Sequence, residues 1–319
     1  MDLDILLPFH RVDQFLIDAI DSLKNSHGVS FNVIAIDDRP DQKIDVSHVF
    51  KSLNNFKLLN TSGGQGYGEA LKIGTQALES SFVALFNSDD LVHPDRFKFQ
   101  LNRLDKSELC ITRMERMDSR AKKSKSLIGD ITTATYDPFL LLFGAYGANA
   151  SWCTHLEWWK TNSFFDNQEC LDWRIGFSSF RNTSISFINK PLYRYRKHPK
   201  QTTANKKLEA TSMDPVFHAW QLFALTYNLK NNSRALFDAF STPWLDGKKL
   251  LASEASDWLV SVRAVFEYLP LDLQINLRKI IQRRLIFAGI NDSNSYLDRF
   301  RYIAKGSPQL APLFHDIIY

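Results

Sequence analysis

Four short segments that are apolar at nearly every position, separated by stretches with a helical apolar period, most constrain how this chain can fold. The helical stretches are residues 12–23 and 69–78. Strands that are apolar on both faces are typical of a parallel sheet covered by helices on its two sides, so we predict an α/β fold. The four predicted strands are residues 4–8 (DILLP), 32–36 (NVIAI), 56–59 (FKLL) and 82–86 (FVALF).

Three of these predicted strands end in polar or acidic residues. Asp37 and Asp38 follow the second strand, and residues 87–90 (NSDD) follow the fourth. Ligands of open parallel sheets bind beyond the carboxyl ends of the strands. Closely spaced carboxylates there suit Mg²⁺ or Mn²⁺ bridging two phosphates. The alternative is that Asp89 and Asp90 only cap the turn that follows, where Asp is common.

The strand–helix alternation weakens after about residue 108, and the second part of the chain is predicted to be helical. We place a boundary near residue 207, which gives domains 1–207 and 208–319. In chain order we predict a hairpin tip or loop at 120–125, mostly helical structure at 136–180, an extended segment or strand pair at 185–195, a linker at 196–207, and helices from about 215.

Composition narrows the class of protein. Hydrophobic residues make up 44% of the chain, charged residues 23%, and the net charge is +4. This is typical of a folded protein, and the charge is too small and too dispersed to indicate nucleic acid binding. The three cysteines show no CxxC spacing, which argues against structural zinc and fits a reducing cytosol. The acidic start and the lack of an apolar run of about 18–20 residues predict a cytoplasmic protein.

Five segments between residues 3 and 205 occur in the order that one enzyme family has. They are 4–10 (DILLPFH), 35–41 (AIDDRPD), 60–74 (NTSGGQGYGEALKIG), 87–89 (NSD) and 193–203 (YRYRKHPKQTT). Together they resemble the family 2 glycosyltransferases of the GT-A fold, a group that includes cellulose, chitin and hyaluronan synthases. The resemblance implies a Rossmann-like, mostly parallel sheet. It also implies an inverting transfer of a sugar from a nucleotide-diphosphate donor, with UDP as the nucleotide, to an acceptor hydroxyl.

The resemblance also assigns residues to the donor site. A divalent metal, Mn²⁺ or Mg²⁺, would be held by Asp89 with His198 as a second contact. The sequence departs from the family pattern in that Asn87 replaces the first aspartate of the metal motif, and Leu71 and Lys72 replace an arginine and an asparagine. Lys72 can still serve the diphosphate as a point charge. The implied nucleotide-sugar contacts are Pro8, Phe9, His10, Asp37, Asp38, Gly64, Lys72, Asn87 and Ser88.

The acceptor motif of the family is imperfect here, in residues 168–173 (QECLDW). If Asp172 is aligned with the family's Asp-Trp pair, it becomes the general base that takes the proton of the acceptor hydroxyl. If Glu169 is aligned instead, Cys170 occupies the position of the base. A thiol is a poor proton acceptor for a sugar hydroxyl, so we prefer Asp172 and keep Glu169 as the alternative. Nearby Trp152, Trp158, Trp159 and Trp173 either stack on acceptor sugars or pack in the core.

Several partners follow from the resemblance. The expected acceptor is a saccharide or a lipid-linked saccharide, in bacterial surface polysaccharide or glycan synthesis. The alternatives are a non-catalytic GT-A module that binds nucleotide-sugar or acts as a scaffold, and a nucleotidyltransferase on a similar fold. No GxGxxG follows the first strand and no GxxxxGK[ST] occurs, which excludes the dinucleotide and P-loop patterns.

Residues 273–288 (LQINLRKIIQRRLIFA) form the clearest amphipathic segment of the C-terminal region. One face carries Leu273, Leu277, Ile280, Ile281, Leu285 and Ala288, and four cations gather on the other side. Such a helix either lies on anionic lipid at the inner face of the plasma membrane or packs on neighbouring helices, within the chain or in a homodimer.

Overall fold

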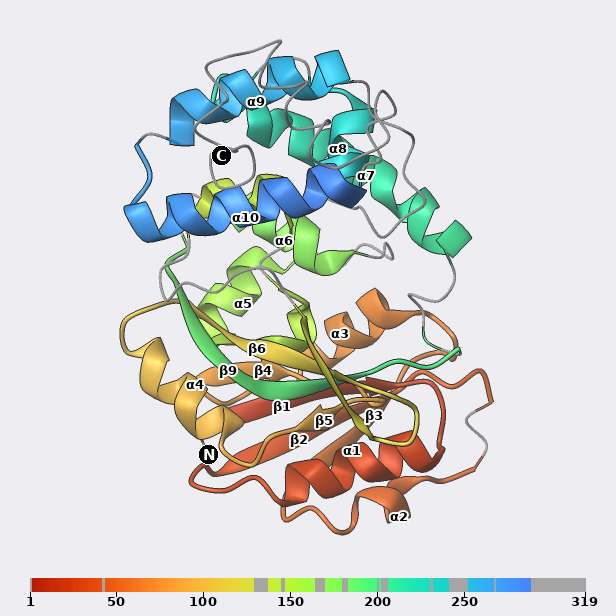
Figure 1. The fold of residues 1–319 in the computed structure, drawn as a ribbon. Helices are drawn as coiled ribbons and strands as arrows, with labels where there is room; N and C mark the ends of the chain where they lie inside the picture. The colour runs from red at the N-terminus through yellow and green to blue at the C-terminus, as the bar shows by residue number, and fades with distance from the viewer. Residues whose placement is uncertain are drawn as a thin grey trace. The chain divides into compact units, whose positions relative to one another are not determined.

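The computed structural model divides into two compact units, which are described separately (Figure 1). The α/β unit comprises residues 1–129, 134–136 and 146–205, and the helical unit comprises residues 130–133, 137–145 and 206–319. The structure describes residues 2–41, 44–128, 137–144, 147–163, 170–179, 183–199, 201, 206–229, 232–240, 252–266 and 268–287.

The first half of the sheet is the parallel arrangement that the apolar segments predict. Its strands are β1 (Leu3–Phe9), β2 (Phe31–Asp37), β3 (Phe56–Asn60) and β4 (Phe82–Leu85), in the spatial order β3-β2-β1-β4. Every residue of β1 is buried, as its apolar sequence requires. Phe9 pairs in register with Asp37, and Asp37 with Asn60, so the carboxyl ends of these three strands lie level with one another.

Helices connect these strands. The helix α1 (Gln14–Lys24) begins after Asp13, whose carboxylate accepts hydrogen bonds from the Phe15 and Leu16 amides. Then follow α2 (Ser47–Phe50), α3 (Tyr67–Thr75) and α4 (Arg96–Leu104). In α3, Gly74 lies so close to the sheet that a Cβ atom there would come within 2.7 Å of Leu6 Cδ2.

The second half of the sheet is mixed. The described part of residues 136–180 is mostly helical, as expected, and includes α5 (Leu156–Asn162) and α6 (Leu171–Ser179), but it also contributes one strand to this half of the sheet. The strands of this half are β5 (Leu91–Val92), β6 (Leu109–Met117), β7 (Lys123–Ile128), β8 (Trp152–His155) and β9 (Ile185–Arg196). Strand β8 joins β4 to β6 by antiparallel pairing on both sides, and β9 runs parallel to β6 with a register shift at Arg113. Strands β6 and β7 form a hairpin, so residues 120–122 lie at a hairpin tip as expected, whereas residues 123–125 of the predicted loop belong to β7.

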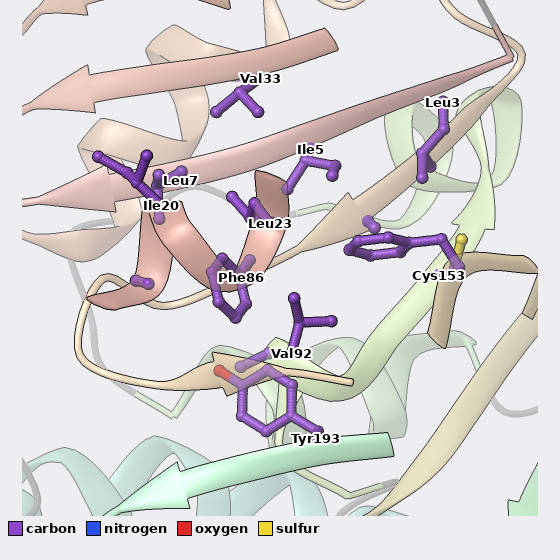
Figure 2. Packing of buried hydrophobic residues seen from close by; sticks show 14 of the residues in the cluster. Leu3, Ile5, Leu7, Ile20, Leu23, Val33, Phe86, Val92, Cys153 and Tyr193 are labelled. Carbon is purple, nitrogen blue, oxygen red and sulfur yellow. The ribbon is translucent and has the colours of Figure 1, made fainter. Parts of the chain in front are cut away.

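The core of the α/β unit fills the space between the sheet and its helices (Figure 2). Strand residues such as Leu3 and Ile5 pack with Leu23 of α1, and the Phe86 ring meets the Tyr193 ring edge-on at 5.8 Å. The tryptophans considered for the acceptor cleft are all buried, at 6% exposure or less, which is the core-packing alternative. None of the three cysteines, all of which lie in the described residues, forms a disulfide bond.

The helical unit contains the short 3₁₀ helix η1 (Pro138–Leu142), α7 (Lys206–Thr226), α8 (Arg234–Phe240), α9 (Ala252–Phe266) and α10 (Leu271–Phe287). Aromatic side chains hold it together. The Trp220 indole donates to the Leu142 carbonyl at 3.2 Å, and the Trp258 ring stacks on Phe240 at 4.6 Å. Segment 137–145 is therefore part of this unit, although it precedes residue 207.

The apolar face predicted for 273–288 is buried where its side chains are described. Leu273, Leu277, Ile280 and Ile281 are each 3% exposed or less, because they pack within the helical unit. The side chain of Leu285 and the whole of Ala288 lie outside the described residues. No helix in the described part of the chain is long and apolar enough to cross a bilayer. Membrane contact, homodimer formation and a cytoplasmic location stay predictions.

Candidate functional site

The loop that follows β4 is anchored by a buried carboxylate. Asp90 is fully buried and accepts hydrogen bonds from the Tyr193 hydroxyl at 2.6 Å, the Arg196 amide at 2.7 Å and the Asn87 side-chain amide at 3.3 Å. Burial raises the pKa of Asp90, the neighbouring Asp89 charge adds to this rise, and the three hydrogen bonds oppose it. Asp90 therefore fixes the loop to β9, and Asp89 beside it remains half-buried.

Asp89 and His198 lie close together beyond the carboxyl end of β4, although the two residues are far apart in the sequence. The distance from His198 Nε2 to Asp89 Oδ2 is 3.0 Å, and the imidazole packs on the Phe15 ring with 4.8 Å between centroids. Within the described residues no third His, Cys, Asp or Glu completes a cluster with them. One carboxylate and one imidazole fit Mn²⁺ or Mg²⁺, because these ions keep several waters and take further oxygen ligands from substrate phosphates.

Arg196 supports this pair from inside the protein. Its guanidinium group is 1% exposed and lies over the Phe15 ring at 4.6 Å. It donates to the Asp89 carbonyl at 2.7 Å, to the Ser119 carbonyl at 3.0 Å and to the Asp18 carboxylate at 3.0 Å. One side chain thus joins the metal-motif loop, the β6–β7 hairpin tip and α1, and sequence reasoning did not single it out.

The two acidic residues at the carboxyl end of β2 are buried, and both bind other groups of the protein. Asp37 is 1% exposed and binds Arg39 through both oxygens, at 2.7–3.0 Å. Hydrogen bonding to Asp37 raises the pKa of Arg39. Asp38 is 6% exposed and accepts hydrogen bonds from Thr61 Oγ1 at 2.6 Å and from the amides of residues 65 and 66 at 2.7 and 2.8 Å.

These bonds hold the glycine-rich turn. Three glycines of this turn have a positive φ: Gly63 (86°), Gly64 (62°) and Gly66 (91°). Residues other than glycine rarely adopt this backbone conformation. The Gly64 amide also donates to the Asp38 carbonyl at 2.9 Å. Asp38 therefore positions the turn, and a carboxylate with about four acceptor sites has one left for a ligand.

The remaining predicted donor-site residues lie in different environments. Pro8 and Phe9 are buried in β1, and the Phe9 ring packs on Phe50 at 5.5 Å. His10 is exposed, yet partial desolvation of its ring and the charge of Arg11 lower its pKa. The charges of three carboxylates act in the opposite direction and raise it: Asp89, Asp38 and Asp13. Ser88 is half-buried beside Asn87. Lys72 lies on α3 and forms an ion pair with Glu69 at 3.2 Å.

Tyr67 and Asn149 lie near Asn87. Tyr67 belongs to the glycine-rich segment 60–74 but had no assigned role, and Asn149 belongs to none of the five segments. The Tyr67 hydroxyl is 3.5 Å from the side-chain oxygen of Asn87 and 3.5 Å from that of Asn149. Burial of this hydroxyl raises the pKa of Tyr67, and the charges of Asp172, Asp89 and Asp90 add to the rise. The negative charges of all three carboxylates therefore act on the Tyr67 hydroxyl.

Asp172, the preferred candidate for the base, is half-buried at the start of α6 (Leu171–Ser179). Glu169 lies outside the described residues. Of the two candidate bases, Asp172 and Glu169, the structure therefore describes only Asp172.

A parallel half-sheet with an acidic loop after β4, continued by a mixed half, defines the GT-A class of nucleotide-sugar enzymes. The chain matches the family model described as glycosyl transferase family 2 over residues 4–187. This match covers more than half of the chain, so the chain belongs to glycosyl transferase family 2.

Known proteins are similar to this chain at low sequence identity. An uncharacterized glycosyltransferase of Haemophilus influenzae strain Rd is 26% identical over 112 residues, which are 34% of this chain and 45% of that relative. The match thus spans less than half of that relative's length. The structure of S. aureus TarS residues 1–349 in complex with UDP-GlcNAc superposes with a TM-score of 0.58 at 15% identity, covering 97% of this chain and 92% of that one. A second TarS structure, in complex with UDP, has a TM-score of 0.54 at 14% identity, with the same coverage. At such identities the likeness shows the fold.

Proposed function

We propose that this chain is a glycosyltransferase that moves a sugar from a UDP-sugar to an acceptor hydroxyl with inversion, using Mn²⁺ or Mg²⁺. The observation that carries the metal role is the 3.0 Å approach of His198 Nε2 to Asp89 Oδ2 at the end of β4. This pair would hold the ion, which when bound supplies positive charge to the departing diphosphate. The acceptor would be a saccharide or a lipid-linked saccharide of a bacterial surface polysaccharide or glycan.

The donor nucleotide would lie along the carboxyl ends of β1 and β2. His10 is exposed there, Asp38 keeps one acceptor site open, and the Gly64 turn allows close approach of the backbone. The TarS structures carry UDP and UDP-GlcNAc in their names, which supports uracil as the base. We assign Pro8, Phe9, Asp37, Asn87 and Ser88 to the walls of this site, with Lys72 near the diphosphate.

Asp172 would take the proton of the acceptor hydroxyl. Removing this proton turns a weak nucleophile into one that attacks the anomeric carbon in a single displacement, and a carboxylate in hydrogen-bond reach suffices. The charge of Asp172 acts on the Tyr67 hydroxyl, which itself contacts Asn87 near the metal pair. This electrostatic effect supports the proposal that Asp172 and the donor loop belong to one continuous site. Glu169 stays the alternative base.

The test is slow release of UDP from UDP-sugars by the purified chain with Mn²⁺. We expect release that EDTA abolishes, and Asp89→Asn should lower it at least a hundredfold, because it removes the charged ligand but keeps the size. Asp95→Asn is a matched control, since the ion pairs of Asp95 among the described residues are with His27 and His93. Full activity in EDTA would refute the metal role. Binding of UDP-sugars without any release would instead favour the non-catalytic module.

A further inference from the structure

We propose that Tyr67, Asn87 and Asn149 form the subsite that recognises a hydroxyl group of the donor sugar. This rests on the proposed function, because it requires a nucleotide-sugar at the same edge of the sheet. Three oxygen atoms from three separate segments converge there. The Tyr67 hydroxyl lies 3.5 Å from the Asn87 side-chain oxygen and 3.5 Å from the Asn149 side-chain oxygen.

The three groups cannot satisfy all of their hydrogen-bonding capacity with one another. A phenol has one proton, so the Tyr67 hydroxyl can donate to one of the two amide oxygens at a time. Both distances are at the long limit for an O–H···O bond, whose usual length is about 2.7–2.8 Å. At least one amide oxygen is thus left to accept a further proton. A sugar hydroxyl, which donates one proton and accepts others, matches this set.

Asn87 is held in the orientation that the subsite needs. Its side-chain nitrogen donates to the buried Asp90 carboxylate at 3.3 Å, which directs its oxygen toward Tyr67. Its backbone amide donates to the Tyr193 hydroxyl at 3.4 Å. The asparagine that replaces the family's aspartate therefore provides a neutral acceptor, and its hydrogen bond to Asp90 fixes its orientation.

Asn149 lies on a turn that is equally constrained. It begins the short 3₁₀ helix η2 (Asn149–Ser151), where Ser151 Oγ donates to the Ala148 carbonyl at 2.8 Å. The preceding Gly147 has a φ of 91°, and a Cβ atom there would come within 3.2 Å of Ile111 Cγ2. The Trp152 indole donates to the Gly147 carbonyl at 3.2 Å. Packing thus fixes the turn before any ligand binds.

Tyr67 is positioned by the Asp38 clamp. It is the first residue of α3 and follows Gly66, whose amide donates to Asp38 Oδ2 at 2.8 Å. Tyr67 is 37% exposed as a whole, although its hydroxyl is desolvated, so a ligand can reach the side chain at this point. All three residues are therefore set by rigid neighbours, as a site that distinguishes one hydroxyl from its epimer must be.

The position of Asn87 favours the donor sugar over the acceptor. Asn87 is two residues before Asp89, which we assign to the metal and diphosphate, and in a nucleotide-sugar the sugar is attached directly to the diphosphate. A pocket that hydrogen-bonds a hydroxyl also rejects analogues that lack it or hold it elsewhere, because its polar groups are then left unpaired.

Calorimetry on the full chain with Mn²⁺ tests the subsite, with UDP and with 4-epimeric pairs of UDP-sugars (UDP-Glc and UDP-Gal, UDP-GlcNAc and UDP-GalNAc) as probes. Tyr67→Phe and Asn149→Ala should each weaken binding of the preferred UDP-sugar about five- to thirtyfold, and reduce the preference between epimers. UDP affinity should stay within about twofold. Tyr268→Phe and Asn189→Ala, both exposed positions, are matched controls expected to change neither.

Each outcome decides the proposal. Equal losses for UDP and UDP-sugar, or no loss for either, overturn the subsite while the proposed function stands. An unchanged donor affinity with a raised KM for the acceptor would assign the trio to the acceptor and overturn the donor assignment. A wild-type chain that binds neither UDP nor any UDP-sugar refutes the proposed function itself, and the subsite with it.

Discussion

Replacing Arg196 by methionine is the sharpest test of how the metal-motif loop is held. Methionine keeps an unbranched apolar stem against Phe15 but removes the bonds to Asp89, Ser119 and Asp18. Breaking a buried, hydrogen-bonded charge pair costs about 3–5 kcal/mol. The Asp18 side chain is 31% exposed and regains water, so the lower end applies, and we expect a loss of about 3 kcal/mol in the stability of the α/β unit.

The assay must report on the α/β unit alone, because two units need not unfold together. The thiols of Cys110 and Cys153 can report on this unit, because both are fully buried in it. Cys170 is only half-buried and is not used as a reporter. Labelling of Cys110 and Cys153 by a thiol reagent in native buffer requires opening of the sheet. A loss of about 3 kcal/mol predicts labelling that is about a hundredfold faster at these two positions.

Arg194→Met is the matched control, two residues away on β9. Arg194 pairs with Glu115 at 2.7 Å, but its side chain is 30% exposed. Partly exposed ion pairs contribute about 1 kcal/mol or less, so labelling should accelerate no more than about fivefold. Similar labelling rates in the two variants would refute the assignment of Arg196 as the residue that ties the loop down.

The remaining predictions concern the base, the clamp and the sheet. Asp172→Asn should lower kcat by about two to four orders of magnitude with UDP-sugar affinity intact; steady-state kinetics in which Glu169→Gln is the inactive variant would reassign the base. Asp38→Ala should weaken UDP binding by about 1–3 kcal/mol, because the turn at 61–66 loses its clamp. Unchanged calorimetric affinity in both Asp38→Ala and Asp37→Ala would contradict it. Gly74→Ala should destabilise by about 1–3 kcal/mol, because its Cβ would press on Leu6 and Ile36; an unchanged Tm would count against this packing.

The parallel half of the sheet could be predicted because its signal is local. Strands β1, β2 and β4 are mostly apolar and buried, as central parallel strands require, whereas the edge strand β3 keeps Lys57 and Asn60 exposed. The Asp89–His198 pair could not be predicted from spacing, since 109 positions separate the two residues. It came from the family motif order, which carries information about tertiary contacts that local periodicity lacks.

Strand β8 and Asn149 show what local signals miss. Residues 152–155 form a strand of four residues between aromatic and helical neighbours, and its pairing with β4 and β6 is a tertiary contact. Asn149 belongs to no motif. The one available signal was Gly147, because a glycine before a short polar turn indicates positive φ and close packing, and both are found there.

The acidic residues at this edge also look equivalent in sequence, and folding separates them. Three of them are 6% exposed or less, and each binds a different part of the protein. The Asp37 carboxylate binds Arg39, that of Asp38 binds the glycine-rich turn, and that of Asp90 binds β9. Asp89 alone of these four keeps a half-buried carboxylate beside an imidazole. In the proposed mechanism the diphosphate is itself strongly negative, so a single carboxylate repels it less than a pair would. In the same mechanism the substrate phosphates would supply the metal ligands that Asn87 does not, and its neutral amide would remain to recognise the sugar.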